Sequence, residues 1–119
     1  MSLTIQRIGT TARFSEAVIH NHTVYLAGQV SQLVEGDINA QTQDVLRQID
    51  EALTRAGTDR GQLLSAQIWL RDMADYAAMN LLWDAWLSDV QAPVRACVQA
   101  PMAKPHYHIE IMVIAAQQA

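Results

Sequence analysis

The sequence predicts a single α+β domain over residues 1–119, with a mixed β-sheet and two helices packed on one of its faces. Two stretches have the apolar spacing of amphipathic helices, and several short runs rich in Val, Ile and Thr have the character of strands. The chain of 119 residues is long enough for one hydrophobic core and too short for two. Because strands and helices alternate on so short a chain, both helices are expected on the same face of the sheet. The other face would be bare in a monomer and would need a partner.

Three strands are predicted in the first part of the chain. Apolar positions within residues 3–8 indicate the first strand. Residues 17–20 and 23–28 indicate a hairpin, because Asn21-His22 between them suits a tight turn. Gly28 closes the second run, where a side chain would block a close approach to the backbone.

Two helices are predicted after these strands. In residues 39–56 the apolar side chains recur every three or four positions, and Gly57 then ends the helix. A second helix follows Asp72, which suits the N-cap position. Its predicted buried stripe consists of Tyr76, Met79, Trp83, Trp86 and Leu87. Asn80 lies inside this stripe, where an amide either hydrogen-bonds a loop backbone in the core or faces a ligand.

Further strands are predicted at residues 64–70, 92–99 and 107–115. In the second of these, Val94, Ala96 and Val98 alternate with Arg95, Cys97 and Gln99. Arginine is unusual in so apolar a strand, and its planar guanidinium suits a carboxylate or a phosphate. The alternative interpretation is a structural ion pair or a place at the edge of the sheet.

Glu110 is the second unusual charge, because it lies among Ile109, Ile111 and Val113. A carboxylate is costly to bury unless it is paired or used. Arg95 is the obvious candidate partner. One interpretation is therefore an Arg95–Glu110 ion pair, and the other is a carboxylate-binding arginine beside a carboxyl group that transfers protons.

The sequence also contains weaker patterns for a metal site and for a nucleophilic cysteine. In the run His106–Ile111 the even-numbered residues share one face, which aligns His106, His108 and Glu110 in a weak pattern for a zinc site. The alternative, given Pro105 before this run, is that His106 belongs to an exposed loop. No second ligand cluster supports the zinc site, and we expect neither a metal nor another cofactor. Cys97 has no activating base near it in sequence, so we interpret it as a packing residue whose backbone is available to a ligand.

The composition disfavours several classes of partner. The net charge of −4, with eight scattered Lys and Arg residues, argues against nucleic acid, which needs a basic patch. No apolar run is long enough to span a membrane, and the N-terminus has no signal pattern. One cysteine cannot form an internal disulfide, which fits a reducing compartment. We therefore expect a cytoplasmic protein.

Motifs of one known family occur over nearly the whole chain. They are Ala12-Arg13-Phe14-Ser15, Ala27-Gly28-Gln29-Val30, Gln41-Thr42, Asp72-Met73-Ala74-Asp75-Tyr76, Met79-Asn80, Ala92-Pro93-Val94-Arg95 and Ile109-Glu110-Ile111. The Pro-x-Arg strand and the terminal Ile-Glu-Ile are specific in combination. With these motifs the chain resembles the RidA family, also called YjgF/YER057c, and most closely its RutC-like, YoaB-like branch.

The resemblance implies a chorismate-mutase-like fold in which three subunits join through their sheets, with ligand clefts between neighbours. It implies hydrolysis of reactive enamines and imines, such as 2-aminoacrylate, to 2-keto acids and ammonia. Arg95 would hold the substrate carboxylate. Glu110 would position and deprotonate the attacking water or relay a proton to the departing amine. The Cys97 backbone would bond the substrate, and Asn80 would lie at the cleft wall.

Phe14, Ala27 and Gly28 would line the same site by this resemblance. The family often has a tyrosine in place of Phe14 and a serine in place of Ala27, so the cleft here has fewer hydroxyl groups. The leading hypothesis is a deaminase of 2-enamino and 2-imino acids. The alternative is a non-catalytic trimer that binds or senses a keto acid through Arg95. Ribonuclease activity fits poorly with the acidic charge.

Overall fold

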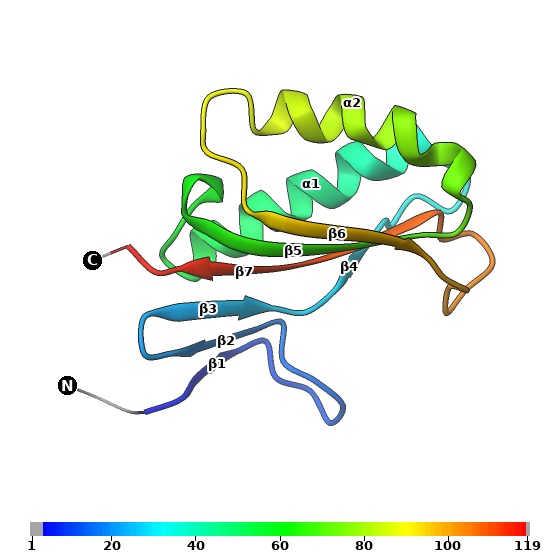
Figure 1. The fold of residues 1–119 in the computed structure, drawn as a ribbon. Coiled ribbons are helices and arrows are strands. Elements are labelled where there is room, and N and C mark those ends of the chain that lie inside the picture. The colour runs from blue at the N-terminus through cyan, green and yellow to red at the C-terminus, as the bar shows by residue number, and fades with distance from the viewer. Residues whose placement is uncertain (1–3, 119) are drawn as a thin grey trace.

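The computed structural model describes residues 4–118, and Figure 1 shows their course. The strands are β1 (Gln6–Ile8), β2 (Ala17–His20), β3 (Thr23–Leu26), β4 (Gln29–Val30), β5 (Leu63–Leu70), β6 (Val94–Gln99) and β7 (Ile109–Ala116). The helices are α1 (Ile38–Arg55) and α2 (Tyr76–Trp86), with short 3₁₀ helices η1 (Arg60–Gln62) and η2 (Met73–Asp75) before β5 and α2.

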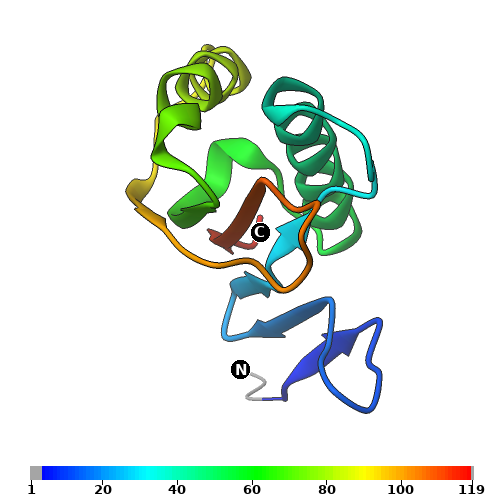
Figure 2. The ribbon, with the colours of Figure 1, turned by 90° about the vertical axis from the view of Figure 1, so that its right-hand side faces the viewer.

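The strands form one mixed sheet in the order β1-β2-β3-β7-β5-β6, and β4 also pairs with β7. β5 and β6 are parallel, whereas β7 runs antiparallel to β3, β4 and β5. Both helices lie on the same face of the sheet, and the β1–β3 ribbon extends away from them (Figure 1, Figure 2). The predicted α+β architecture is confirmed, and β6 forms one edge of the sheet.

The hydrophobic core lies between the helices and the sheet. The odd-numbered residues of β7 face the helices, and Ile109 and Ile111 are fully buried there. Ile68 of β5, Ile49 of α1 and Met79 of α2 are buried against the same layer. Within residues 4–118, no helix has both the length and the apolar character needed to cross a membrane.

The opposite face of the sheet carries exposed apolar side chains and is called the open face here. Val94 and Val98 of β6 are 72% and 47% exposed, and Tyr25 and Met112 also lie on this face. Both helices lie on the other face of the sheet (Figure 1). A single chain therefore leaves an apolar sheet surface in water, as the sequence predicts.

The predicted hairpin is present, but some predicted strand limits were wrong. Asn21 and His22 both have positive φ, as a tight two-residue turn requires. Only the first four residues of the predicted run 23–28 form a strand, because the chain leaves β3 after Leu26 and pairs with β7 again as β4, from Gln29. β1 covers only Gln6–Ile8, and Leu3 lies outside the described residues.

The start of α2 also differs from the prediction. Asp72 accepts a hydrogen bond from the Ala74 N–H and caps η2, so α2 itself begins at Tyr76. Met79, Trp83, Trp86 and Leu87 are buried as predicted, but Tyr76 is 38% exposed. Tyr76 lies in the first turn of α2, where the helix meets the edge strand rather than the centre of the core.

Gln41 of α1 ties two loops to the core. It is fully buried, and its Nε2 donates to the carbonyl oxygens of Leu33, Gly36 and His106. Its Oε1 accepts a hydrogen bond from the His108 N–H at 2.8 Å. The start of β7 is thereby fixed against α1.

We expect Gln41→Ala to lower the free energy of unfolding by at least about 2 kcal/mol, because several buried backbone groups would lose a partner. Gln43→Ala is the control, since Gln43 is exposed on the same helix. Urea unfolding of both variants measures the difference. Equal stability of the two variants would contradict the structural role given to Gln41.

Candidate functional site

Arg95 lies beneath α2 on the helix-facing side of β6. It pairs with Ala66 of β5, and Ala66 pairs with Val113 of β7, both of which are buried on that side. Its Nη1 donates to Asn80 Oδ1 at 2.8 Å, and its Nη2 donates to Tyr76 Oη at 3.2 Å.

Aromatic rings also surround this guanidinium. Its central carbon lies 5.7 Å from the ring centroid of Trp83 and 5.8 Å from that of Tyr76. Contacts of this kind stabilise a cation by about 0.5–2 kcal/mol. Among residues 4–118, Arg95 forms no ion pair with an acidic side chain. Its positive charge is held in place by neutral groups and is free to bind an anion.

Tyr76, Asn80 and Trp83 reach Arg95 because they are spaced along one face of α2. Asn80 was predicted at the site, whereas Tyr76 and Trp83 were expected only to pack in the core. The spacing of all three was the signal that could have identified them. The sequence does not show that β6 lies under this face of α2.

Glu110 lies on the opposite face of the sheet from Arg95. It pairs with Trp69 of β5 and Val30 of β4, whereas its neighbours Ile109 and Ile111 face the helices. The predicted Arg95–Glu110 ion pair is therefore wrong for a single chain. Alternation along each strand was read correctly, but the two strands present their charged residues to different faces.

The Glu110 carboxylate rests against the backbone of Gly28. A Cβ atom at position 28 would overlap Glu110 Oε2, so a residue with a side chain there would displace the carboxylate. Within residues 4–118, the Glu110 carboxylate has no hydrogen-bond or ion-pair partner. Partial burial raises the pKa of Glu110 above its usual value. An unpaired carboxyl group with a raised pKa is suited to accept and release protons.

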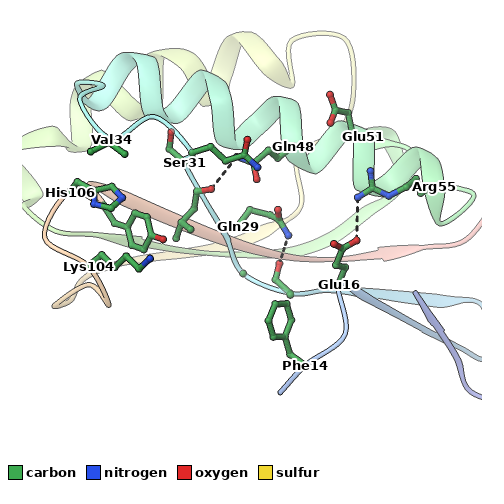
Figure 3. Close-up of a pocket in the computed structure, with 15 residues that line it drawn as sticks. Phe14, Glu16, Gln29, Ser31, Val34, Gln48, Glu51, Arg55, Lys104 and His106 are labelled. Carbon is green, nitrogen blue, oxygen red and sulfur yellow. Dashed lines mark hydrogen bonds and ion pairs between the residues drawn. The ribbon is translucent and has the colours of Figure 1, made fainter. Parts of the chain in front are cut away.

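Phe14, Ala27 and Gly28 line a groove of about 570 Å³ between the β3–β4 turn and α1 (Figure 3). Phe14 is 56% exposed, and neither it nor Ala27 supplies a hydroxyl group. Glu16 and Arg55 form an ion pair across the groove at 3.7 Å. Glu110 contacts Gly28. We call these four predicted residues, Phe14, Ala27, Gly28 and Glu110, the first half-site.

Cys97 lies on the same side of β6 as Arg95, two residues further along. Burial raises the pKa of its thiol, and the nearby Arg95 charge only partly offsets this effect. The thiol is therefore mostly protonated at neutral pH, which fits the packing role expected for it. With Arg95 and Asn80, it belongs to a second half-site at the β6 edge.

The histidines of the alternative zinc pattern do not lie on one strand. β7 begins at Ile109, and His106 belongs to the preceding turn, where its ring packs against Tyr107. The described part of the chain contains no cluster of three His, Cys, Asp or Glu residues arranged to hold a metal ion. The alternation that aligned His106 with Glu110 was wrong, because the strand starts later than predicted.

Comparisons with known proteins identify clear relatives. A family model described as Endoribonuclease L-PSP matches residues 4–117. The chain is 45% identical to the RutC family protein YoaB of Escherichia coli (strain K12), over 96% of this chain and 99% of that protein. It is 30% identical to a goat (Capra hircus) protein named 2-iminobutanoate/2-iminopropanoate deaminase, over 98% of this chain and 94% of that protein. A crystal structure of a YjgF family member from Neisseria meningitidis superposes with a TM-score of 0.94 at 44% identity, covering 98% of each chain.

The raised pKa of Glu110 predicts how stability depends on pH. Below the usual glutamate pKa of about 4.3, the folded and unfolded states are both protonated, and the group contributes no difference. As the pH rises above this value, the unfolded state ionises first, so the buried carboxylate progressively destabilises the folded state. Glu110→Gln should therefore be more stable than the wild type at pH 7, with an advantage that disappears below about pH 4.

Thermal unfolding between pH 3.5 and 8 measures this difference. Glu35→Gln is the control, because Glu35 is exposed. A Glu110→Gln protein that is less stable than the wild type at pH 7 would contradict an unpaired Glu110 and indicate a stabilising partner from a neighbouring chain.

Proposed function

We propose that this chain, which belongs to the RidA/YjgF family in its RutC-like branch, hydrolyses reactive 2-enamino and 2-imino acids to 2-keto acids and ammonia. The observation that carries the proposal is the Arg95 guanidinium, which is oriented by Asn80 and Tyr76 and lacks an acidic partner within residues 4–118. A planar cation of this kind suits the carboxylate of a small acid. The name of the goat relative, an iminobutanoate and iminopropanoate deaminase, supports this substrate class.

The two half-sites would meet between neighbouring subunits. Arg95, Asn80 and Cys97 lie at the β6 edge, whereas Glu110 and Gly28 lie across the sheet on the other face. No rearrangement within one sheet brings side chains on opposite faces together. A homotrimer packed through the open face would bury its exposed valines and tyrosine, and would set Arg95 of one copy beside Glu110 of another.

The proposed reaction assigns each half-site one task. Arg95 binds the substrate carboxylate and fixes the imine carbon in the cleft, and the backbone of Cys97 contributes a further hydrogen bond. Glu110, with its raised pKa, removes a proton from a water molecule whose oxygen attacks this carbon. The carboxyl group then returns the proton to nitrogen. The carbinolamine that results still carries the hydroxyl proton, which Glu110 takes from oxygen and passes to the amine nitrogen. The C–N bond then breaks as the C=O bond forms, so ammonia leaves, the 2-keto acid remains, and the reaction consumes one water.

The alternative function is a binding protein for a keto acid. Phe14 and Ala27 provide no hydroxyl group in the groove beside Glu110, which leaves few proton carriers around a bound substrate. The same Arg95 site would then bind a carboxylate without turnover. Despite the name of the family model, we do not propose RNA as the substrate, because the net charge is −4 and the basic residues are scattered. A reducing cytoplasmic location suits the free thiol of Cys97.

We expect the protein to accelerate the hydrolysis of 2-aminoacrylate generated in situ, measured as keto-acid formation. Arg95→Ala should lower kcat/KM by about 10- to 150-fold, because charge-assisted hydrogen bonds would be lost. Arg95→Lys should restore only part of this loss, since the ammonium keeps the charge but not the planar fork. Arg7→Ala, which removes an exposed arginine on β1, is the control.

The same variants separate the two functions. Pyruvate binding that depends on Arg95, without any turnover, would support the binding protein over the enzyme. A well-folded Arg95→Ala protein with wild-type turnover would exclude both proposals.

We expect Met112→Asp to disrupt the proposed assembly, because Met112 lies on the open face and a buried unpaired carboxylate costs several kcal/mol. Sedimentation of the wild type should give a trimer, and the variant should shift toward monomer at micromolar concentration. Leu81→Asp introduces the same charge on the outer side of α2, where Leu81 is 73% exposed, and should leave the assembly intact. A wild-type protein that sediments as a monomer would remove the proposed cleft.

A further inference from the structure

We propose that Tyr76 is a second carboxylate-binding residue, whose phenol O–H donates a hydrogen bond to the same ligand carboxylate that Arg95 binds. This inference rests on the carboxylate site of the proposed function. Tyr76 was expected in the core from its helical spacing. A role at the site would affect how tightly and how selectively the protein binds small acids.

The phenol of Tyr76 has an unused donor next to Arg95. Its oxygen accepts a hydrogen bond from Arg95 Nη2 at 3.2 Å. A tyrosine hydroxyl can accept and donate at the same time. Within residues 4–118, the hydroxyl has no acceptor for its own hydrogen. The side chain is 38% exposed, so this donor is open to a ligand from solvent.

Other residues hold the guanidinium from behind. Trp83 is only 4% exposed, its ring lies 5.7 Å from the central carbon of Arg95, and Asn80 Oδ1 accepts from Nη1. Because Trp83 is buried and Tyr76 is 38% exposed, we infer that solvent reaches the cation on the Tyr76 side. An anion that approaches Arg95 from solvent therefore meets the phenol hydroxyl beside the guanidinium.

A carboxylate fits this pair of donors. Each of its oxygens accepts more than one hydrogen bond, so one oxygen can take a bond from the guanidinium and another from the phenol. The corresponding amide would present an NH₂ group that cannot accept from either donor. Tyr76 would thus increase the preference of the site for 2-keto and 2-imino acids over their neutral amides.

The test is the binding of pyruvate and pyruvamide by calorimetry, together with turnover. Tyr76→Phe keeps the ring and deletes only the hydroxyl. We expect pyruvate to bind about 5- to 20-fold more weakly, and we expect a smaller loss for pyruvamide, which has one acceptor oxygen in place of the two carboxylate oxygens. KM should rise by a similar factor while kcat changes by less than about twofold, because binding rather than the chemical step is affected. Thr54→Val is the control, since it removes a hydroxyl group from the exposed side of α1.

Testing Tyr76→Phe in the Arg95→Lys variant distinguishes a hydrogen bond from Tyr76 to the ligand from a role of Tyr76 in positioning Arg95. In Arg95→Lys the guanidinium is absent, so a hydroxyl that only orients it has no further role. We expect Tyr76→Phe to weaken pyruvate binding in this background also. A loss confined to the wild-type background would show that Tyr76 only positions Arg95, and it would overturn the proposal.

Two other outcomes would also overturn the proposal. If Tyr76→Phe binds pyruvate as tightly as the wild type, Tyr76 does not contact the carboxylate, while the function proposed for Arg95 is unaffected. If the wild-type protein itself does not bind pyruvate, the carboxylate site fails, and the role of Tyr76 fails with it. Thermal unfolding of each variant identifies any loss that comes from misfolding.

Discussion

The alternation of side chains along β-strands places Arg95 and Glu110 on opposite faces of one sheet. Arg95 shares its face with Ala66 and the helices, whereas Glu110 shares its face with Trp69 and Val30. A change of one residue in register would move every side chain of a strand to the other face and expose the core. The separation of the two charges is therefore as firmly fixed as the core itself.

This separation explains why each charge lacks an acidic or basic partner in the described chain. Arg95 is stabilised by an amide, a phenol and two aromatic rings, none of which neutralises it. Glu110 is packed against Gly28, where burial without a partner raises its pKa. The partial burial of Glu110 without a partner is costly for stability, and neither charge contributes to the hydrophobic core. Such costs are typical of residues retained for binding or chemistry.

Much of the fold follows from local patterns in the sequence, whereas the relation between distant strands does not. The apolar repeat of α1 and the Asn21-His22 turn each depend on neighbouring residues, and both were predicted. The faces of β6 and β7 depend on how each strand pairs with β5, which no local pattern encodes. Val94 and Val98 are as apolar as core residues, yet they lie on the open face.

Local patterns in the sequence indicate candidate residues for the site but not their relative position. Alternation and composition singled out Arg95 and Glu110 because charges are rare in such strands. The role of Tyr76 was missed because helical periodicity assigns it to the same stripe as Met79, although it lies in the first turn, beyond the edge of the core. The alignment of His106 with Glu110 depended on a strand that starts near residue 107, whereas β7 starts only at Ile109.

Burial links assembly to chemistry in the proposed trimer. Covering the open face would remove water from around Glu110, which raises the pKa of this carboxyl group, whereas Arg95 of the neighbouring copy would lower it. The same loss of water would strengthen the attraction between Arg95 and a carboxylate, since the interaction of two charges grows as the local dielectric constant falls. Association through the open face would thus change both the pKa of Glu110 and the attraction of Arg95 for a carboxylate. A monomer would hold the same residues with Glu110 more hydrated and Arg95 more weakly attractive.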